Sequence, residues 1–189
     1  MKSLVRAVAF IMLLPGCVSR PPDHLYVLEA QPPGGRDART EFDRQVTLHV
    51  TLPSLVDRSQ MVVTTSTGIA ILEHERWAAP LPDLVITTLG QDLERRRGDL
   101  LVVLKSAEPS RIALIAIAVD VVQLTVRLGE PASLEARWRV TDARTGKVLL
   151  GREVFVSPTR AANYAEVAGA LSACVALLAD RLVQALPAG

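Results

Sequence analysis

The chain has 189 residues, of which 49% are hydrophobic and 22% charged, and its formal net charge at pH 7 is +1. Nucleic-acid binding needs an excess of Lys and Arg on one face, so this balanced charge argues against a nucleic-acid partner. Removal of the leader described next leaves about 170 residues, which is enough for one domain with a substantial core.

The N-terminal segment has the layout of a bacterial lipoprotein signal peptide over residues 1–16. Lys2 and Arg6 precede an apolar run at residues 7–14. Such a run is too short to cross the ~30 Å hydrocarbon core of a bilayer as a retained helix. The leader is therefore expected to be read and removed.

The predicted cleavage falls between Gly16 and Cys17, and Cys17 is the predicted lipidation site. A diacylglycerol thioether on Cys17, together with acylation of the new N-terminus, would make a stable membrane anchor. Pro15 departs from the usual pattern, but the alternative of an ordinary secretory leader lacks an Ala-x-Ala site near Gly16. An Asp directly after the lipidated Cys would resemble a signal that retains lipoproteins in the inner membrane. Position 18 holds Val instead, which favours a location at the periplasmic face of the outer membrane.

Residues 17–43 are predicted to form a Pro- and Gly-rich tether that carries a short docking strand. Proline pairs at 21–22 and 32–33 favour an extended chain, while the glycines at 34–35 allow it to bend. At ~3 Å per residue, the folded part could stand tens of ångströms away from the bilayer. Residues 25–28 are predicted to be the docking strand.

The first half of the folded region is predicted to contain three strands and a helix. Residues 46–52 alternate between apolar and polar, which is typical of a half-buried strand, and residues 61–65 and 69–72 resemble a hairpin. Leucine spacing after the prolines at 80 and 82 predicts a helix that ends at the arginines 95–97. These arginines are expected to be solvated, and the alternative is contact with lipid headgroups or an acidic partner.

The second half of the folded region is predicted to contain four strands followed by a helix. Residues 100–104 form a short strand, and residues 112–126, rich in Ile and Val, are expected at the centre of a sheet covered on both faces. Residues 133–142 alternate, with Trp138 on the apolar face and Arg137 and Arg139 on the polar face. A loop at 142–146 leads into an antiparallel return at 147–156. The last helix is expected to begin at the capping pair Asn163 and Glu166.

This order of elements predicts a single α+β domain over residues 44–189, in which an antiparallel sheet packs two main helices on one face. Trp77 and Trp138 are expected to be core residues rather than lipid-contacting aromatics. Cys174 falls within an apolar helical pattern, so it is expected to be a buried, inert thiol. With Cys17 lipidated, Cys174 has no intramolecular disulfide partner.

The order of features resembles the family of ABC-type transport auxiliary lipoproteins, which the PqiC-like intermembrane transport lipoproteins typify. The segments that carry the resemblance are Tyr26-Val27-Leu28, Val50-Thr51-Leu52-Pro53, Leu55-Val56-Asp57-Arg58-Ser59-Gln60-Met61-Val62, Arg76-Trp77-Ala78-Ala79-Pro80-Leu81 and Leu134-Glu135-Ala136-Arg137-Trp138. The resemblance implies an outer-membrane lipoprotein that works with a mammalian-cell-entry-domain protein, and often with an ABC transporter, to move phospholipid or other hydrophobic molecules. It supplies no catalytic motif to transfer.

The residues themselves predict neither a catalytic site nor a cofactor or metal site. His24, His49 and His74 are far apart in sequence, without the Cys or His-x-x-x-His spacing of zinc sites, and no Gly-x-Ser-x-Gly elbow or phosphate loop is present. A triad of Ser54, Asp57 and His74 is the open enzymatic alternative. A structural lipoprotein that supports assembly of outer-membrane protein or lipopolysaccharide is the second non-catalytic hypothesis. Free sheet edges also predict a possible homo-oligomer.

Overall fold

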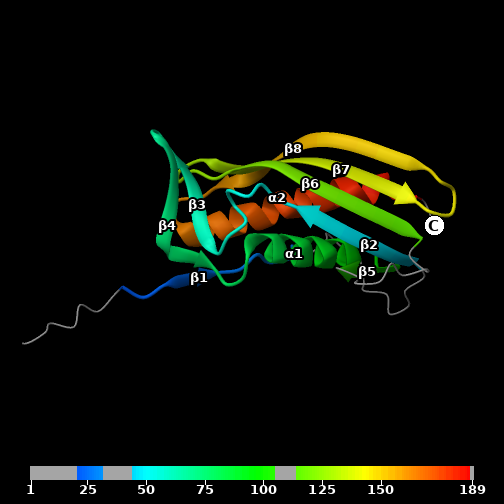
Figure 1. Cartoon of the computed structure of the whole chain (residues 1–189), viewed down its shortest axis with the longest axis horizontal. Helices are drawn as coiled ribbons and strands as arrows, with labels where there is room; N and C mark the ends of the chain where they lie inside the picture. Colours follow the sequence, from blue (N-terminus) through cyan, green and yellow to red (C-terminus); the bar gives the residue numbers. More distant parts are fainter. Residues whose placement is uncertain (1–20, 32–43, 105–113, 188–189) are drawn as a thin grey trace, which may run out of the picture.

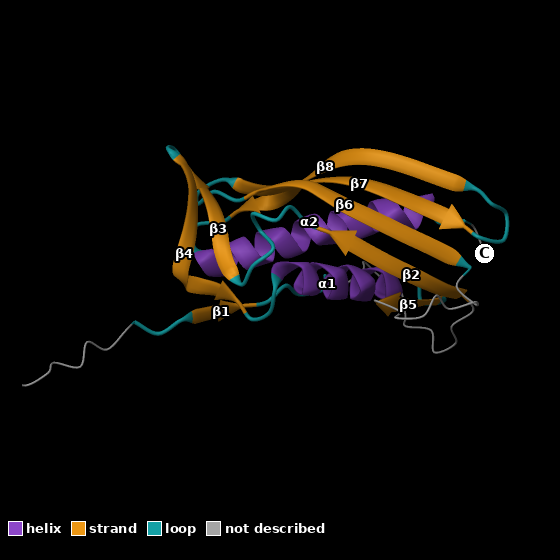
Figure 2. Ribbon diagram, viewed as in Figure 1, coloured by secondary structure: helices purple, strands orange, loops and turns teal. Residues whose placement is uncertain are grey.

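The computed structural model describes residues 21–31, 44–104 and 114–187, which form an α+β fold of two helices and two sheets (Figures 1 and 2). This fold class agrees with the sequence analysis. The elements in chain order are β1 (His24–Tyr26), β2 (Arg44–Thr51), β3 (Gln60–Thr65), β4 (Gly68–Trp77), α1 (Leu81–Arg96), β5 (Leu100–Leu104), β6 (Ile115–Thr125), β7 (Pro131–Asp142), β8 (Val148–Arg160) and α2 (Tyr164–Ala185).

The main sheet has five strands in the order β5-β2-β6-β7-β8 and is mixed, so the prediction of an antiparallel sheet was only partly right. β2 pairs in parallel with both β5 and β6, whereas the hairpin-linked β7 and β8 are antiparallel. The chain between β2 and β5 passes through a hairpin and α1, and a crossover of that length brings the chain back in the same direction.

Both helices cover one face of the main sheet, and the other face is left open (Figure 2). The central strand β6 therefore alternates between buried and exposed residues, and the expectation that it is covered on both faces was wrong. Ile117 and Val119 face the helices, whereas Ala116 and Ala118 are exposed. Alanine reads as apolar in a sequence pattern, but its small side chain leaves little surface that needs burial.

Two of the three arginines at the end of α1, Arg96 and Arg97, are held within the protein, which corrects the expectation that all three are solvated, whereas Arg95 is exposed as expected. Buried Arg96 donates to Asp92, one turn earlier, and to Asp180 of α2 at 2.6 Å. Arg97 bonds to both carboxylate oxygens of Asp99 at 2.8 and 2.7 Å. The basic helix end thus joins α1 to α2 and to the turn before β5.

The helix α2 begins as the sequence predicts and completes the core. The side chain of Asn163 accepts a hydrogen bond from the backbone N–H of Glu166 at 2.9 Å, which caps the first turn. Trp138 of β7 is 4% exposed beneath this helix, and the guanidinium of Arg181 lies 5.1 Å from the centre of its ring. Trp77 is also buried, so both tryptophans are core residues as expected.

A second sheet of three strands, β1-β4-β3, lies at one end of the main sheet (Figure 1). The predicted hairpin is β3 and β4, and the predicted docking strand is β1, which pairs in parallel with β4. Beyond β1, Leu28 is buried, the backbone N–H of Glu29 donates to Ser172, and that of Gln31 donates to Asp92. Residues 21–31 are thus part of the folded domain rather than a free tether.

Candidate functional site

The predicted lipidation and cleavage residues, Cys17 and Gly16, lie outside the described residues. Within residues 21–31, 44–104 and 114–187, no helix is both long enough and apolar enough to cross a membrane.

The residues considered for enzymatic or metal chemistry are not assembled into such a site. His74 and His24 lie on neighbouring strands, but each contacts a carboxylate, Asp23 and Glu75 respectively, at 3.0 Å. In the part of the chain that the structure describes, no hydrogen bond links His74 to Ser54 or Asp57, and no group of three metal-ligating side chains occurs.

Two ionisable groups, Asp92 and Cys174, are buried within the fold. Asp92 is fully buried on α1, and desolvation raises the pKa of its carboxyl although Arg96 opposes the shift. Its Oδ1 accepts hydrogen bonds from Arg96 and from the backbone of Gln31, so it fastens the N-terminal segment to the helix. Cys174 is buried, as the sequence predicted, and this burial raises the pKa of its thiol to about 11.

The open face of the main sheet brings polar and apolar side chains from four strands into rows. The first row contains His49 of β2, Ala118 of β6, Arg139 of β7 and Leu150 of β8. The next row contains Thr51, Asp120, Arg137 and Arg152 on the same four strands. Side chains two residues apart on a strand share a face, so the two rows are adjacent.

These rows line a shallow hollow of about 600 Å³, which we call the arginine groove. Its lining residues are His49, Thr51, Ala118, Val119, Asp120, Arg137, Trp138, Arg139, Leu150, Gly151 and Arg152. Ala118 has the smallest side chain in the two rows and is exposed between His49 and Arg139. The arginines and Leu150 line the same hollow, so the groove combines positive charge with apolar surface.

The three arginines of the arginine groove differ in whether they have a partner within the protein. Arg137 is ion-paired with Asp120, whose pKa is held below its usual value by hydrogen bonds from Thr51 and Arg137. Arg152 bonds to Glu135 at 2.7 Å. Arg139 has no hydrogen bond or ion pair with any described residue, so its guanidinium is free to bind an incoming carboxylate.

The strand β8, at the edge of the main sheet, extends this surface. Four of its apolar side chains face outward with Arg152 at their centre: Val148, Leu150, Val154 and Val156. Leu150 is 67% exposed, and no described strand pairs with the outer side of β8. An unpaired edge offers backbone donors and acceptors to an added strand. Pro158, near the end of β8, limits such pairing to the earlier part.

Sequence reasoning identified part of this surface but not its centre. It assigned Arg137 and Arg139 to the polar face of an alternating strand, and the structure confirms this. It did not single out the outward valines and leucine of β8, because residues 148–150 and 154–156 are apolar throughout and show no alternation that would tell the exposed face from the buried one. Exposed apolar rows of this kind mark interaction sites more often than catalytic ones.

Comparison with known proteins gives a family and a fold. Residues 26–183 match the model of the family described as ABC-type transport auxiliary lipoprotein component. An uncharacterised protein of known structure is similar, with a TM-score of 0.70 and 15% identity over 88% of this chain and 100% of that chain. A DUF330-family protein from Xanthomonas campestris has a TM-score of 0.60 and 15% identity over 85% and 91% of the two chains. No curated protein matches.

Proposed function

The chain belongs to the family of ABC-type transport auxiliary lipoprotein components, and from this premise we propose that it is a non-catalytic docking subunit of an intermembrane lipid-transport system. It is anchored at the periplasmic face of the outer membrane. Its partner is a mammalian-cell-entry-domain protein, with ABC transporter components in the same system. Family membership is the single observation that carries this proposal.

The anchor of the proposed subunit is the lipid on Cys17. Cleavage between Gly16 and Cys17 releases the signal peptide, residues 1–16, and leaves the acylated cysteine as the new N-terminus. Val18, in place of Asp, supports sorting to the outer membrane. The protein then needs no spanning helix of its own.

The docking surface of the proposed subunit is the arginine groove together with the outer edge of β8. The partner contributes an extended segment that pairs with β8 and presents both apolar and acidic residues on the face that continues the arginine groove. Its apolar side chains cover Leu150 and Val154, and an acidic side chain reaches Arg139. Main-chain hydrogen bonds supply affinity in this binding mode, and the side chains supply specificity.

Self-association is part of the same proposal, and it uses unlike edges. Antiparallel pairing of two β8 strands about Arg152 would match their apolar side chains but would set two arginines opposite each other. Like charges opposite each other across a strand pair are destabilising. The opposite edge strand of the main sheet is β5, which pairs on its outer side with no described strand and carries the exposed apolar residues Leu101 and Leu104. Contact between unlike edges produces rings or filaments.

The test is a binding measurement between the purified domain and the mammalian-cell-entry-domain protein from the same gene neighbourhood. Arg139→Glu reverses the charge in the groove and should weaken binding at least tenfold, because the partner's carboxylate then meets a carboxylate. Arg144→Glu makes the same charge change in the exposed hairpin loop and is the matched control. Circular dichroism should show that both variants remain folded.

Other results would redirect the proposal. Equal affinities for the two variants would exclude the arginine groove as the docking surface. Absence of any such partner, with a β-barrel protein co-purifying instead, would favour a role in outer-membrane assembly. Turnover of an ester or nucleotide that depends on His74 would contradict the non-catalytic assignment. Gel filtration with light scattering reports the number of copies.

A further inference from the structure

We propose that the side of the domain carrying β1 lies directly against the lipid bilayer, with Leu25 and Val27 inserted at the level of the headgroups. Leu25 is 65% exposed and Val27 48% exposed, although both are apolar. The proposal rests on the anchoring through Cys17 and adds to it an orientation of the domain and a membrane-contact surface.

The length of chain between the anchor and the fold limits how far the domain can stand from the membrane. Cys17 precedes Pro21, the first described residue, by four positions. An extended chain spans at most about 3.3–3.6 Å per residue, so Pro21 lies within about 14 Å of the lipidated cysteine. Because residues 21–31 belong to the fold, the tether of tens of ångströms that the sequence suggested is not available.

The segment that follows the anchor is fixed firmly to the domain. β1 pairs in parallel with β4 from His24 opposite Glu75 to Tyr26 opposite Trp77. The hydroxyl of Tyr26 donates to Glu75 at 2.6 Å, and this hydrogen bond lowers the pKa of Glu75 and raises that of Tyr26 to about 12. Leu25, between these two anchored residues, therefore has a fixed position on the surface.

The charged groups of β1 and of residues 74–76 opposite it are paired within the protein, whereas Glu73 nearby is exposed and has no ion pair with a described residue. Asp23 lies 3.0 Å from His74 and 3.9 Å from Arg76, and Glu75 contacts both His24 and Tyr26. Such pairing limits the repulsion that free carboxylates would feel near anionic headgroups. Leucine and valine side chains lose unfavourable contact with water when they enter the interfacial region, so they supply the attraction.

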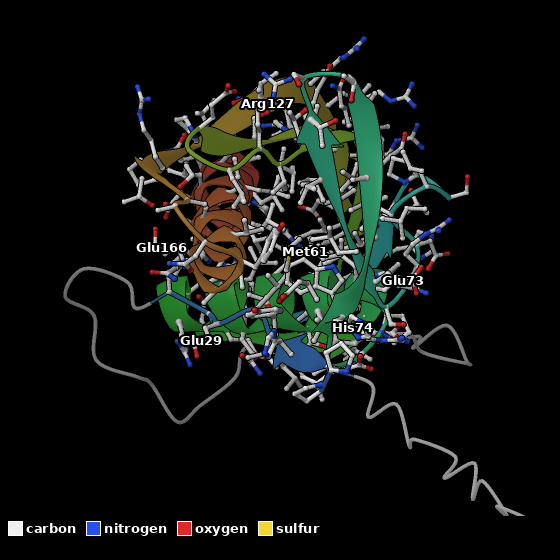
Figure 3. All side chains as sticks on the ribbon, turned by 90° about the vertical axis from the view of Figure 1, so that its left-hand side faces the viewer. Glu29, Met61, Glu73, His74, Arg127 and Glu166 are labelled. Carbon is white, nitrogen blue, oxygen red and sulfur yellow. The ribbon has the colours of Figure 1, made fainter. Side chains whose placement is uncertain are left out.

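This orientation keeps the docking surface accessible. Figures 1 and 3 show β1 and β8 on opposite sides of the domain, and His74 lies on the β1 side in Figure 3. With β1 against the bilayer, the outer edge of β8 points away from it. Membrane contact and partner binding then use opposite surfaces of one small domain.

The experiment places an environment-sensitive fluorophore at one position of the full lipoprotein. Leu25→Cys is labelled with nitrobenzoxadiazole, and Arg144→Cys, in the β7–β8 hairpin, is the matched control. Cys174 does not compete for label because it is buried and its pKa is raised to about 11, and the Cys17 sulfur is a thioether. The proteins are reconstituted into vesicles of phosphatidylethanolamine and phosphatidylglycerol, with or without lipids brominated on their acyl chains.

We expect emission from the label at position 25 to rise at least twofold on reconstitution and to be quenched by brominated lipid, with neither change at position 144. If the protein floats with vesicles but both labels stay unquenched, the membrane-contact surface is wrong while the anchor stands. If the protein does not float, the anchor is wrong. The labelled domain is then attached through a hexahistidine sequence replacing residues 1–17 to nickel-chelating lipid. Quenching at position 25 would still support the contact surface, and its absence would overturn it.

Discussion

Gly151 offers the sharpest test of the packing between β8 and the core. A Cβ atom added at Gly151 would lie 2.7 Å from Nε1 of Trp138 and closer still to Cε2 and Cζ2 of the same ring. The ring cannot move aside easily because it is buried and Arg181 lies against it. Gly151→Ala should therefore destabilise the domain by about 2 kcal/mol through overpacking, although alanine in place of glycine would otherwise favour folding.

The proposed contact is tested by making Gly151→Ala again in a protein that lacks the Trp138 ring. Trp138→Leu removes the atoms that the new methyl group would meet, so Gly151→Ala in that background should be neutral or slightly stabilising. Urea unfolding followed by circular dichroism on the four proteins gives the coupling free energy, expected at about 2 kcal/mol. In the wild-type background the melting temperature should fall by about 4–8 °C. Equal losses in both backgrounds would refute the proposed contact.

Two further predictions concern the proposed lipid anchor at Cys17 and the charge of Asp99, which follows α1. Cys17→Ser should yield a folded protein in the soluble periplasmic fraction, and persistence with membranes after a high-salt wash would show that another part of the chain anchors it. Hydrogen bonds from Arg97 lower the pKa of Asp99, so Asp99 stabilises the fold above the carboxyl's ordinary pKa and loses that effect as the pH falls through the lowered value. Asp99→Asn should therefore be less stable than wild type in urea at pH 7, and the difference should narrow toward pH 3. A difference that does not change with pH would exclude the charge as its cause.

Most of the helices and strands could be predicted from local sequence patterns. Each type of secondary structure repeats its buried side chains with a fixed spacing, so residues close together in the chain reveal it. Alternation placed Trp138 on the buried face of β7 and Arg137 on the opposite face. The pair Asn163 and Glu166 marked the start of α2, since its cap needs only residues within one turn. The predicted leader, residues 1–16, and the predicted lipidation site Cys17 that follows it likewise rest on a local signal.

Contacts between segments that are far apart in the sequence could not be predicted from local patterns. The parallel pairing of β2 with β6 joins residues such as Val46 and Ile115, and nothing in either strand states its partner or direction. Arg96 looked like a solvated helix end because its partner Asp180 is far along the chain. Burial of Leu28, which makes residues 21–31 part of the domain, likewise depends on a pocket built by later elements.

The sequence by itself therefore determined the family, the elements and the faces of each strand, all of which depend on residues close together in the chain. Tertiary structure decided which face of the main sheet stays uncovered, and so where Arg139 and Leu150 meet as one groove. It also set β1 and β8 on opposite sides of the domain. The physical reason is that a surface is made by strands lying side by side, and their order follows from packing the whole core at once rather than from any single segment.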